Sequence, residues 1–243
     1  MRLLLIIPTH NEELVIEKNL REVFARGESL LQNYDWSVLV ADNGSTDKTG
    51  KIVTSLQSTF PKLSLWQTDV PGRGNALRTV WQKFDADIYA YMDADLATDL
   101  NELPKLLHEL EEHDIAIGSR LLKSADVKRS MLREFVSRIY LFLSHAIVPV
   151  RAKDLQCGFK AAKKEALYTI LPHTSHNGWF FDSELVVLAE HLGYKVKEIP
   201  VSWNESPDER RKTTVNITST AWDNIVHLFK LRRRLKKLSR ERS

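Results

Sequence analysis

Strand-like apolar runs alternate with helix-like segments through the first half of this chain, and this alternation restricts the fold more than any other feature. The strand-like runs are rich in aliphatic and aromatic residues; they are residues 3–7, 38–41, 63–66, 88–92 and 115–118. Segments with apolar residues at helical spacing follow them; they are residues 12–26, 47–57, 75–84 and 101–111. Strands that alternate with helices pair mostly in parallel. We therefore expect an α/β domain with a mostly parallel central sheet and helices on both faces.

The second half has a different pattern. It predicts a helix over residues 131–150, a strand over 196–203, a charged loop over 205–212 and a last helix over about 215–238. The last helix should carry a broad apolar face, and basic residues gather toward its end. The apolar residues of that face are Trp222, Ile225, Val226, Phe229, Leu231 and Leu235. We expect one domain over residues 1–212, followed by an amphipathic helix and basic tail over 213–243.

Charge is distributed unevenly along the chain. Residues 210–243 contain 11 Lys or Arg and two acidic residues, a net charge of +9, whereas the rest of the chain carries −6. A basic end on a mildly acidic body is typical of contact with an anionic surface, either a membrane or a nucleic acid. The lone Cys157 excludes an internal disulfide framework and suits a reducing compartment. The five apolar residues before Pro8 are too few for a signal-peptide core, and no run approaches the roughly 18 apolar residues of a membrane span.

Polar residues follow three of the predicted strands, at residues 8–12, at 42–45, and at Asp93 and Asp95. Ligands of parallel sheets bind at the carboxyl ends of the strands. Strand alternation would direct Asp93 and Asp95 the same way, and two neighbouring carboxylates resist ionising unless a cation compensates them. Hard oxygen ligands suit Mg²⁺ or Mn²⁺ bound together with substrate phosphates. The pair alone fits a metal site or two solvated loop aspartates about equally, and the three polar strand ends together favour a site.

Eight short motifs occur in one order along the chain. They are IPTHNEE (7–13), VADNGSTD (40–47), GRGNALR (72–78), MDAD (92–95), GSR (118–120), DLQCGFK (154–160), WFFDSEL (179–185) and PVSWNE (200–205). This series, over about residues 3–212, resembles the family-2 inverting glycosyltransferases of the GT-A fold, a single Rossmann-like domain. Within that family it looks most like the dolichyl- or polyprenyl-phosphate hexose synthases, and the DLQCGFK and WFFDSEL motifs lean toward the glucose branch. Ala97 stands where the mannose branch often has a glutamine as a further metal ligand.

The resemblance implies transfer of a hexose from UDP-glucose, or from a similar donor such as GDP-mannose, to a polyprenyl phosphate with inversion. Such an acceptor is already anionic, so it needs positioning and charge compensation rather than a strong general base. Asp93 and Asp95 would hold the Mg²⁺ or Mn²⁺ that offsets charge on the departing diphosphate. The residues implied for the nucleotide sugar are Pro8, His10, Glu12, Asp42, Asn43, Arg73, Asp93 and Gln156. Those implied for the acceptor phosphate are Arg120, Arg133, Ser137, Arg211 and Lys212, and those implied for catalysis are Asp93, Asp95, Arg120, Arg133, Ser137 and Asp182.

Several of these residues also have ordinary structural interpretations. Glu12 could simply favour a helix dipole, residues 42–45 could form a capping turn, and Asp182 could cap a helix instead of contacting the sugar or acceptor. Cys157 fits a small packed side chain better than a nucleophile.

Two other functions remain open. One is a glycosyltransferase for a soluble acceptor, in which Asp182 is the best candidate base. The other is a non-catalytic module whose basic tail binds a membrane or nucleic acid. Because the last helix combines Trp and Phe with Lys and Arg, it suits a membrane interface. We therefore expect a cytoplasmic protein, peripheral on the inner membrane face, with no nucleic-acid partner.

Overall fold

The computed structural model describes residues 1–128, 131–204 and 217–242. Its strands are β1 (Arg2–Thr9), β2 (Asp35–Asn43), β3 (Leu63–Thr68), β4 (Ile88–Tyr91), β5 (Ile115–Ser119), β6 (Asp126–Lys128), β7 (Lys160–Lys163), β8 (Val196–Pro200) and β9 (Ser202–Asn204). Its α-helices are α1 (Ile16–Leu30), α2 (Thr49–Leu56), α3 (Arg73–Lys83), α4 (Leu103–His108), α5 (Met131–Ile147), α6 (Lys164–Ile170), α7 (Phe181–His191) and α8 (Ile217–Arg242).

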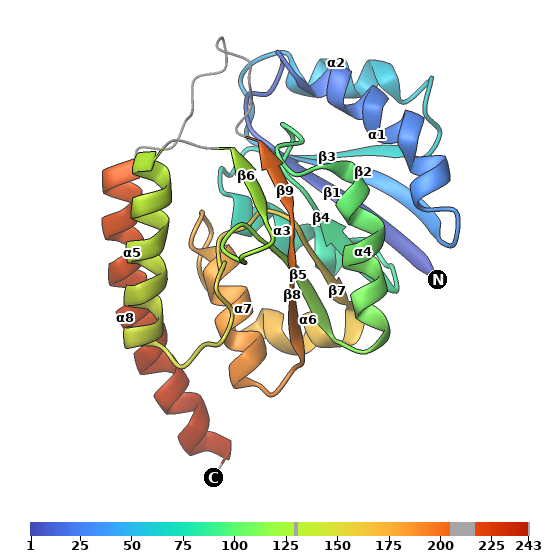
Figure 1. The fold of residues 1–243 in the computed structure, drawn as a ribbon. Coiled ribbons are helices and arrows are strands. Elements are labelled where there is room, and N and C mark those ends of the chain that lie inside the picture. The colour runs from blue at the N-terminus through green and yellow to red at the C-terminus, as the bar shows by residue number, and fades with distance from the viewer. Residues whose placement is uncertain (129–130, 205–216, 243) are drawn as a thin grey trace.

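The strands form a seven-stranded sheet in the order β3-β2-β1-β4-β7-β5-β8 (Figure 1). All neighbours in it pair in parallel except β7, which runs antiparallel to both β4 and β5. The short strands β6 and β9 form a separate parallel pair. The expected mostly parallel sheet is therefore confirmed. Strand β7 was not predicted, because its sequence Lys-Ala-Ala-Lys lacks the β-branched and aromatic residues that indicate a strand.

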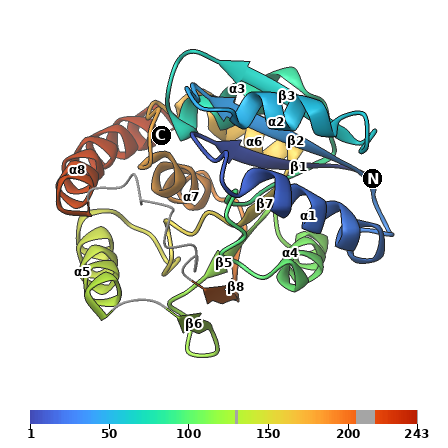
Figure 2. The same cartoon turned by 90° about the horizontal axis from the view of Figure 1, so that it is seen from above.

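Helices cover both faces of the sheet, as Figures 1 and 2 show. Alternate residues of β1 point to opposite faces: Leu4 and Ile6 join one core cluster, and Leu3, Leu5 and Ile7 join the other. Helices α3, α6 and α7 pack on the first face, and α1, α2 and α4 pack on the second. Each such side chain, when fully buried, contributes roughly 1.5–3 kcal/mol. The two layers hold the carboxyl ends of the parallel strands at one edge of the molecule.

Helices α5 and α8 lie side by side at the margin of the fold (Figures 1 and 2). Three leucines at helical spacing on α8, Leu228, Leu231 and Leu235, are buried in the core cluster that α7 also joins. Among the described helices, none combines the length and apolar content needed to cross a bilayer.

Several predicted boundaries shift by a few residues. Helix α5 stops at Ile147 rather than at residue 150, because a residue before a proline, here Val148 before Pro149, is disfavoured in helical conformation. The strand predicted over residues 196–203 is divided: β8 ends at Pro200, and β9 begins at Ser202. Proline lacks the N–H that a central strand needs, and β8 is an edge strand of the sheet. Residues 215–216 of the last predicted helix lie outside the described residues.

Candidate active site

The ends of β1 and β2 are joined by hydrogen bonds between their polar residues. Thr9 pairs with Asp42 in the parallel register, and the Asn43 side-chain amide donates to the Thr9 carbonyl oxygen at 2.6 Å. Nδ1 of His10 lies 3.2 Å from the Asn43 carbonyl oxygen. The buried carboxylate of Asp42 accepts from the Gln67 side chain at 2.9 Å and from the Ser45 backbone at 3.1 Å. The Asp42 bond to Ser45 shows that residues 42–45 do form a turn, on an edge that also gathers the predicted nucleotide contacts.

The turn before α1 connects to the same edge. The Glu12 backbone N–H donates to the Thr49 hydroxyl at 2.8 Å, and the Glu12 carbonyl accepts from Val15 and Ile16. Pro8 is buried within β1. The structure thus brings together the predicted residues Pro8, His10, Glu12, Asp42 and Asn43 at the ends of two adjacent strands.

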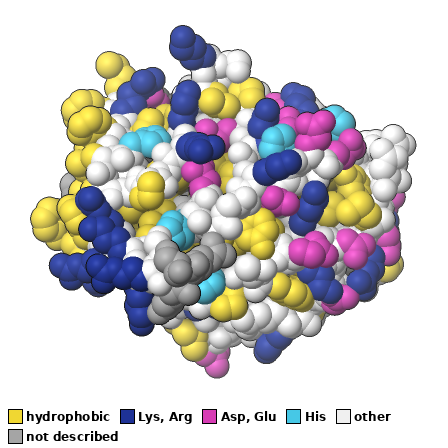
Figure 3. Space-filling view, turned by 90° about the horizontal axis from the view of Figure 1, so that it is seen from below, with side chains coloured by type: hydrophobic (Ala, Val, Ile, Leu, Met, Phe, Trp, Pro, Cys, Tyr) yellow, Lys and Arg dark blue, Asp and Glu magenta, His cyan; other side chains and the backbone are white. Residues whose placement is uncertain are grey.

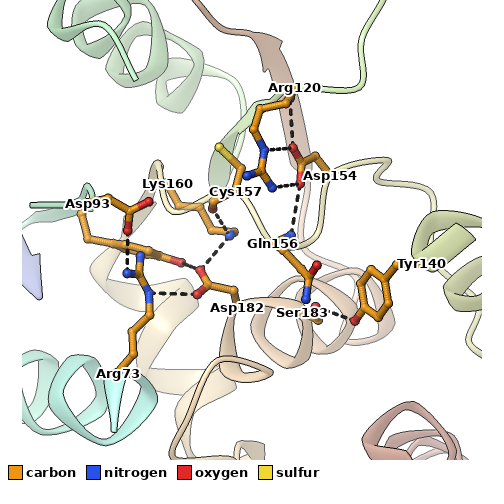
Figure 4. Close-up of polar contacts among 11 residues, drawn as sticks. Arg73, Asp93, Arg120, Tyr140, Asp154, Gln156, Cys157, Lys160, Asp182 and Ser183 are labelled. Carbon is orange, nitrogen blue, oxygen red and sulfur yellow. Dashed lines mark hydrogen bonds and ion pairs between the residues drawn. The ribbon is translucent and has the colours of Figure 1, made fainter. Parts of the chain in front are cut away.

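Asp93, Arg73 and Asp182 form a line of charges at the end of β4 (Figure 4). Nη1 of Arg73 donates to Oδ1 of Asp93 at 2.6 Å, and its Nε donates to Oδ2 of Asp182 at 3.0 Å. Arg73 is almost fully buried, and its Nη2 has no hydrogen-bond partner among the described residues. A buried donor without a partner is costly, so this nitrogen is suited to an anionic ligand.

Asp182 is enclosed by donors. Its side chain is 4% exposed, and Nζ of Lys160, itself 1% exposed, donates to it at 2.8 Å. The Tyr91 hydroxyl donates to the same oxygen. Burial alone would raise the pKa of Asp182, but the Lys160 and Arg73 cations outweigh it and hold that pKa below its usual value. The carboxylate caps no helix, because α7 has no side-chain cap bond; it is the shared counter-ion of two buried cations.

The metal motif has an arrangement of oxygen atoms that fits a hard divalent cation. The Ala97 backbone N–H holds Oδ1 of Asp95 at 3.1 Å. A Cβ atom at Gly158 would lie 2.3 Å from Oδ2 of Asp93, so only glycine leaves room for that carboxylate. Burial raises the pKa of Asp93, Arg73 opposes this effect, and the neighbouring Asp95 adds to it. Carboxylates held together in this way fit Mg²⁺ or Mn²⁺.

Arg120 and Asp154 form a bidentate ion pair on the other side of Cys157 (Figure 4). Nε and Nη2 of Arg120 donate to the two carboxylate oxygens at 2.7 and 2.9 Å. Burial would raise the pKa of Asp154, and the Arg120 cation lowers it below the usual value. The Gln156 backbone N–H donates to the same carboxylate at 3.3 Å. Asp154 therefore already matches the charge of Arg120, which brings donors rather than net positive charge to any acceptor.

Cys157 is buried beside this pair, and burial raises the pKa of its thiol to about 12. It is therefore a neutral packed side chain at neutral pH.

The structure describes the other predicted acceptor residues only in part. Ser137 lies on α5, one turn after Arg133, whose side chain is outside the described residues. Arg211 and Lys212 also lie outside the described residues. These assignments therefore remain predictions.

Three important residues were not assigned any role from the sequence: Tyr91, Asp154 and Lys160. Lysine is almost never fully buried without a partner, and nothing local in the sequence indicated that Lys160 would be. Its position inside the DLQCGFK motif was the one available signal.

An α/β sheet with acidic, cation-balanced groups at the carboxyl ends of its strands is typical of proteins that bind a ligand at that edge. Residues 4–171 match the sequence model of glycosyl transferase family 2, and the chain belongs to that family. It is 33% identical over 208 residues to the glycosyltransferase AglD of Haloferax volcanii, a match covering 84% of this chain and 33% of that protein. It is 32% identical over 219 residues to a dolichyl-phosphate beta-glucosyltransferase of Trichomonas vaginalis, with 85% of this chain and 65% of that protein covered. The chain thus spans less than two thirds of the length of these relatives.

The fold is also that of known glycosyltransferases. A glucosyl-3-phosphoglycerate synthase from Mycobacterium tuberculosis, solved with Mn²⁺, UDP and glucosyl-3-phosphoglycerate, superposes with a TM-score of 0.68 at 16% identity. The match covers 95% of this chain and 79% of that one. The expected GT-A fold is therefore confirmed.

Proposed function

We propose that this protein transfers a hexose from a nucleotide sugar, UDP-glucose in the first instance, to a polyprenyl or dolichyl phosphate with inversion. Family membership supports the class of reaction. The name of the Trichomonas vaginalis relative, dolichyl-phosphate beta-glucosyltransferase, supports the donor sugar and the acceptor.

The proposal of a phosphate acceptor depends on the environment of Asp182. An enzyme that glycosylates a hydroxyl group needs a base to remove the proton of that hydroxyl. Asp182, the best candidate, is buried, receives donors from Lys160, Arg73 and Tyr91, and has a lowered pKa. A carboxylate in that state is a weak base. A phosphate acceptor needs none, because its oxygen is already anionic at neutral pH.

The donor would bind at the ends of β1, β2 and β4. Pro8, His10, Glu12, Asp42 and Asn43 would contact the base and ribose. Asp93 and Asp95 would hold Mg²⁺ or Mn²⁺, which when bound offsets negative charge on the departing diphosphate.

Arg73 would hold Asp93 in place through Nη1 and offer to the bound donor its Nη2, which has no partner within the described part of the chain. Gln156 would border the sugar. The acceptor phosphate would be held by Arg120, Arg133 and Ser137, with Arg211 and Lys212 adding positive charge.

An acceptor comparison tests this proposal. The protein is incubated with UDP-glucose and Mg²⁺ or Mn²⁺, and with a short polyprenyl phosphate, the matching polyprenol, or a free saccharide. We expect transfer to the polyprenyl phosphate alone, and loss of transfer in Asp95→Ala. Transfer to the polyprenol or the saccharide would overturn the proposed acceptor. A parallel series with GDP-mannose identifies the donor.

We also propose that the α5–α8 edge meets the membrane that carries the acceptor. Phe135 and Phe142 on α5 are 61% and 73% exposed, and Trp222 and Phe229 on α8 are 70% and 50% exposed. Figure 3 shows hydrophobic side chains at this edge next to a cluster of Lys and Arg side chains. Exposed aromatic residues beside basic ones suit an interface with anionic lipids. On this proposal residues 1–212 form the transferase domain, and 213–243 help to hold it on the cytoplasmic face.

Vesicle flotation tests the membrane surface. The double variant Phe135→Ser/Phe142→Ser should bind lipid vesicles much less than the wild type. Leu14→Ser, at an apolar residue before α1 that is 53% exposed, is the control and should bind normally. Equal binding by the double variant and the wild type would refute this surface.

A further inference from the structure

A second group of metal-binding side chains lies where the loop after α6 meets α8. His176 comes from that loop, and Asp223 and His227 come from α8. One nitrogen of each imidazole and one carboxylate oxygen of Asp223 all lie within 4.8 Å of one another. We propose that these three side chains bind a divalent transition-metal ion, best matched by Zn²⁺, that fastens α8 to the loop. This site is separate from the Asp93–Asp95 motif and does not depend on the transferase proposal.

The distances between these three side chains are close to those between the ligands of a bound ion. Asp223 and His227 are four residues apart and so share one face of the helix, with Nδ1 of His227 3.3 Å from Oδ1 of Asp223. Nε2 of His176 lies 3.8 Å from Oδ2 of Asp223, and the two imidazole centroids are 4.4 Å apart. Ligands about 2 Å from a tetrahedral zinc lie about 3.3 Å from one another. A contraction of up to about 1.5 Å, from within 4.8 Å to about 3.3 Å, would therefore close the site.

The ligand set selects the kind of metal. Two imidazoles and one carboxylate, with a fourth position open to water, are a common set for Zn²⁺. The Asp93–Asp95 motif offers oxygen atoms, which suit Mg²⁺ or Mn²⁺.

The loop is held in place by groups other than the proposed ligands. The backbone N–H groups of Ser175 and His176 donate to one oxygen of Glu184 at 3.0 and 2.9 Å. Nη2 of Arg78 donates to the His176 carbonyl at 2.8 Å. The Phe180 ring packs 5.5 Å from both imidazoles. Because the loop is already ordered, an ion would meet a site that costs little further conformational entropy.

Two hydrogen bonds must change when the ion binds. Nδ1 of His227 lies 2.8 Å from the Asp223 carbonyl oxygen, and ligation through this nitrogen removes that bond. Nδ1 of His176 accepts the Gly178 N–H at 3.0 Å, so the neutral ring carries its proton on Nε2, which faces Asp223. Ligation through Nε2 moves that proton to Nδ1 and releases the Gly178 N–H. The next residue is Trp179, whose ring lies 5.5 Å from the Arg73 guanidinium. The proposed ion therefore acts on a segment that borders the candidate active site.

Calorimetric titration of the full chain with Zn²⁺, in excess Mg²⁺ to fill the oxygen-rich motif, tests the inference. We expect Zn²⁺ to bind and to raise the melting temperature. Asp223→Asn and His227→Ala should each weaken binding by at least about tenfold. Asp223→Asn is the safer variant, because it keeps the shape of a side chain that is more than half exposed.

His145→Ala is the matched control. His145 is an exposed histidine on α5 whose Nδ1 lies 3.0 Å from the Leu141 carbonyl, four residues earlier, as Nδ1 of His227 lies 2.8 Å from the Asp223 carbonyl. The His145→Ala variant should bind Zn²⁺ as the wild type does. Unchanged affinity in both site variants, or no binding by the wild type, would overturn the inference. Loss of binding in Asp95→Asn would also overturn it, since the ion would then occupy the aspartate motif.

Discussion

At the scale of single residues, the candidate site depends on one carboxylate shared by two buried cations. Lys160 and Arg73 have lost most of their hydration, and Asp182 compensates both. Removing one partner of a buried ion pair leaves an uncompensated charge, which costs about 3–5 kcal/mol. Asp182 therefore contributes to the site by holding Arg73 beside Asp93.

We predict that Asp182→Asn lowers the free energy of unfolding by about 3–5 kcal/mol in urea denaturation. Adding Lys160→Met should restore part of this loss, because the second change removes one of the unpaired charges. Asp85→Asn, in surface ion pairs with Arg2 and Lys164, is the control and should cost no more than about 1 kcal/mol. Since the pKa of Asp182 is lowered on folding, its stabilising effect is present above the unfolded pKa of about 3.9 and is lost as the pH falls below it. Equal stability of Asp182→Asn and the wild type would contradict this account.

The variant Gly158→Ala tests the metal motif without removing either aspartate. The added Cβ would lie 2.3 Å from Oδ2 of Asp93 and would displace that carboxylate. We predict that the apparent affinity for Mn²⁺ with UDP falls by about 10–100-fold, as for other changes that misplace a metal ligand. Calorimetry measures the affinity, and the melting temperature of the variant shows whether it remains folded. A folded variant with wild-type affinity would mean that Asp93 does not bind the metal.

At the scale of elements, α8 has one face that is buried against the core and another that is exposed. The sequence predicted this helix with Phe229 and Leu231 on one apolar face. In the structure Leu231 is buried against the core, whereas Phe229 is half exposed. We predict that Leu231→Ala lowers the free energy of unfolding by about 2–5 kcal/mol, and that Phe229→Ala changes it by less than about 0.5 kcal/mol. Urea denaturation measures both, and similar losses in the two variants would show that both faces pack.

The sequence predicts an element well when the element's own residues indicate it, and poorly when the element depends on contacts with distant parts of the chain. Strands β1, β2, β4 and β5 are apolar runs, and the structure confirms each of them. Strand β7 is antiparallel and only four residues long, and its pairing depends on β4 and β5 rather than on its own composition. The same reason applies to the site. Asp93 and Asp95 form a local motif, whereas the partners of Asp182 lie 22 and 109 residues away in the chain.

At the scale of the whole molecule, charge is distributed unevenly between the C-terminal segment and the rest of the chain. Residues 210–243 carry +9, and the rest of the chain carries −6. The outer face of α8 exposes Lys230, Arg232, Arg233 and Lys236, beside the exposed aromatic residues of the proposed membrane face. A dipolar protein of this kind would approach an anionic membrane with α8 first. Each Lys or Arg near such a surface contributes about 1 kcal/mol to binding.

We therefore predict that binding to vesicles containing phosphatidylserine weakens as ionic strength rises. Between about 0.01 and 0.15 M salt the Debye length shortens from about 30 to 8 Å, so the attraction between the basic face and the lipid is increasingly screened. Replacing Lys230, Arg232, Arg233 and Lys236 by glutamine should lower binding at low salt and remove most of this salt dependence. Glutamine at Lys18, Lys51 and Lys163, which lie on other elements, is the control and should leave both unchanged. Equal salt dependence in the two multiple variants would show that attraction to the membrane arises elsewhere than on α8.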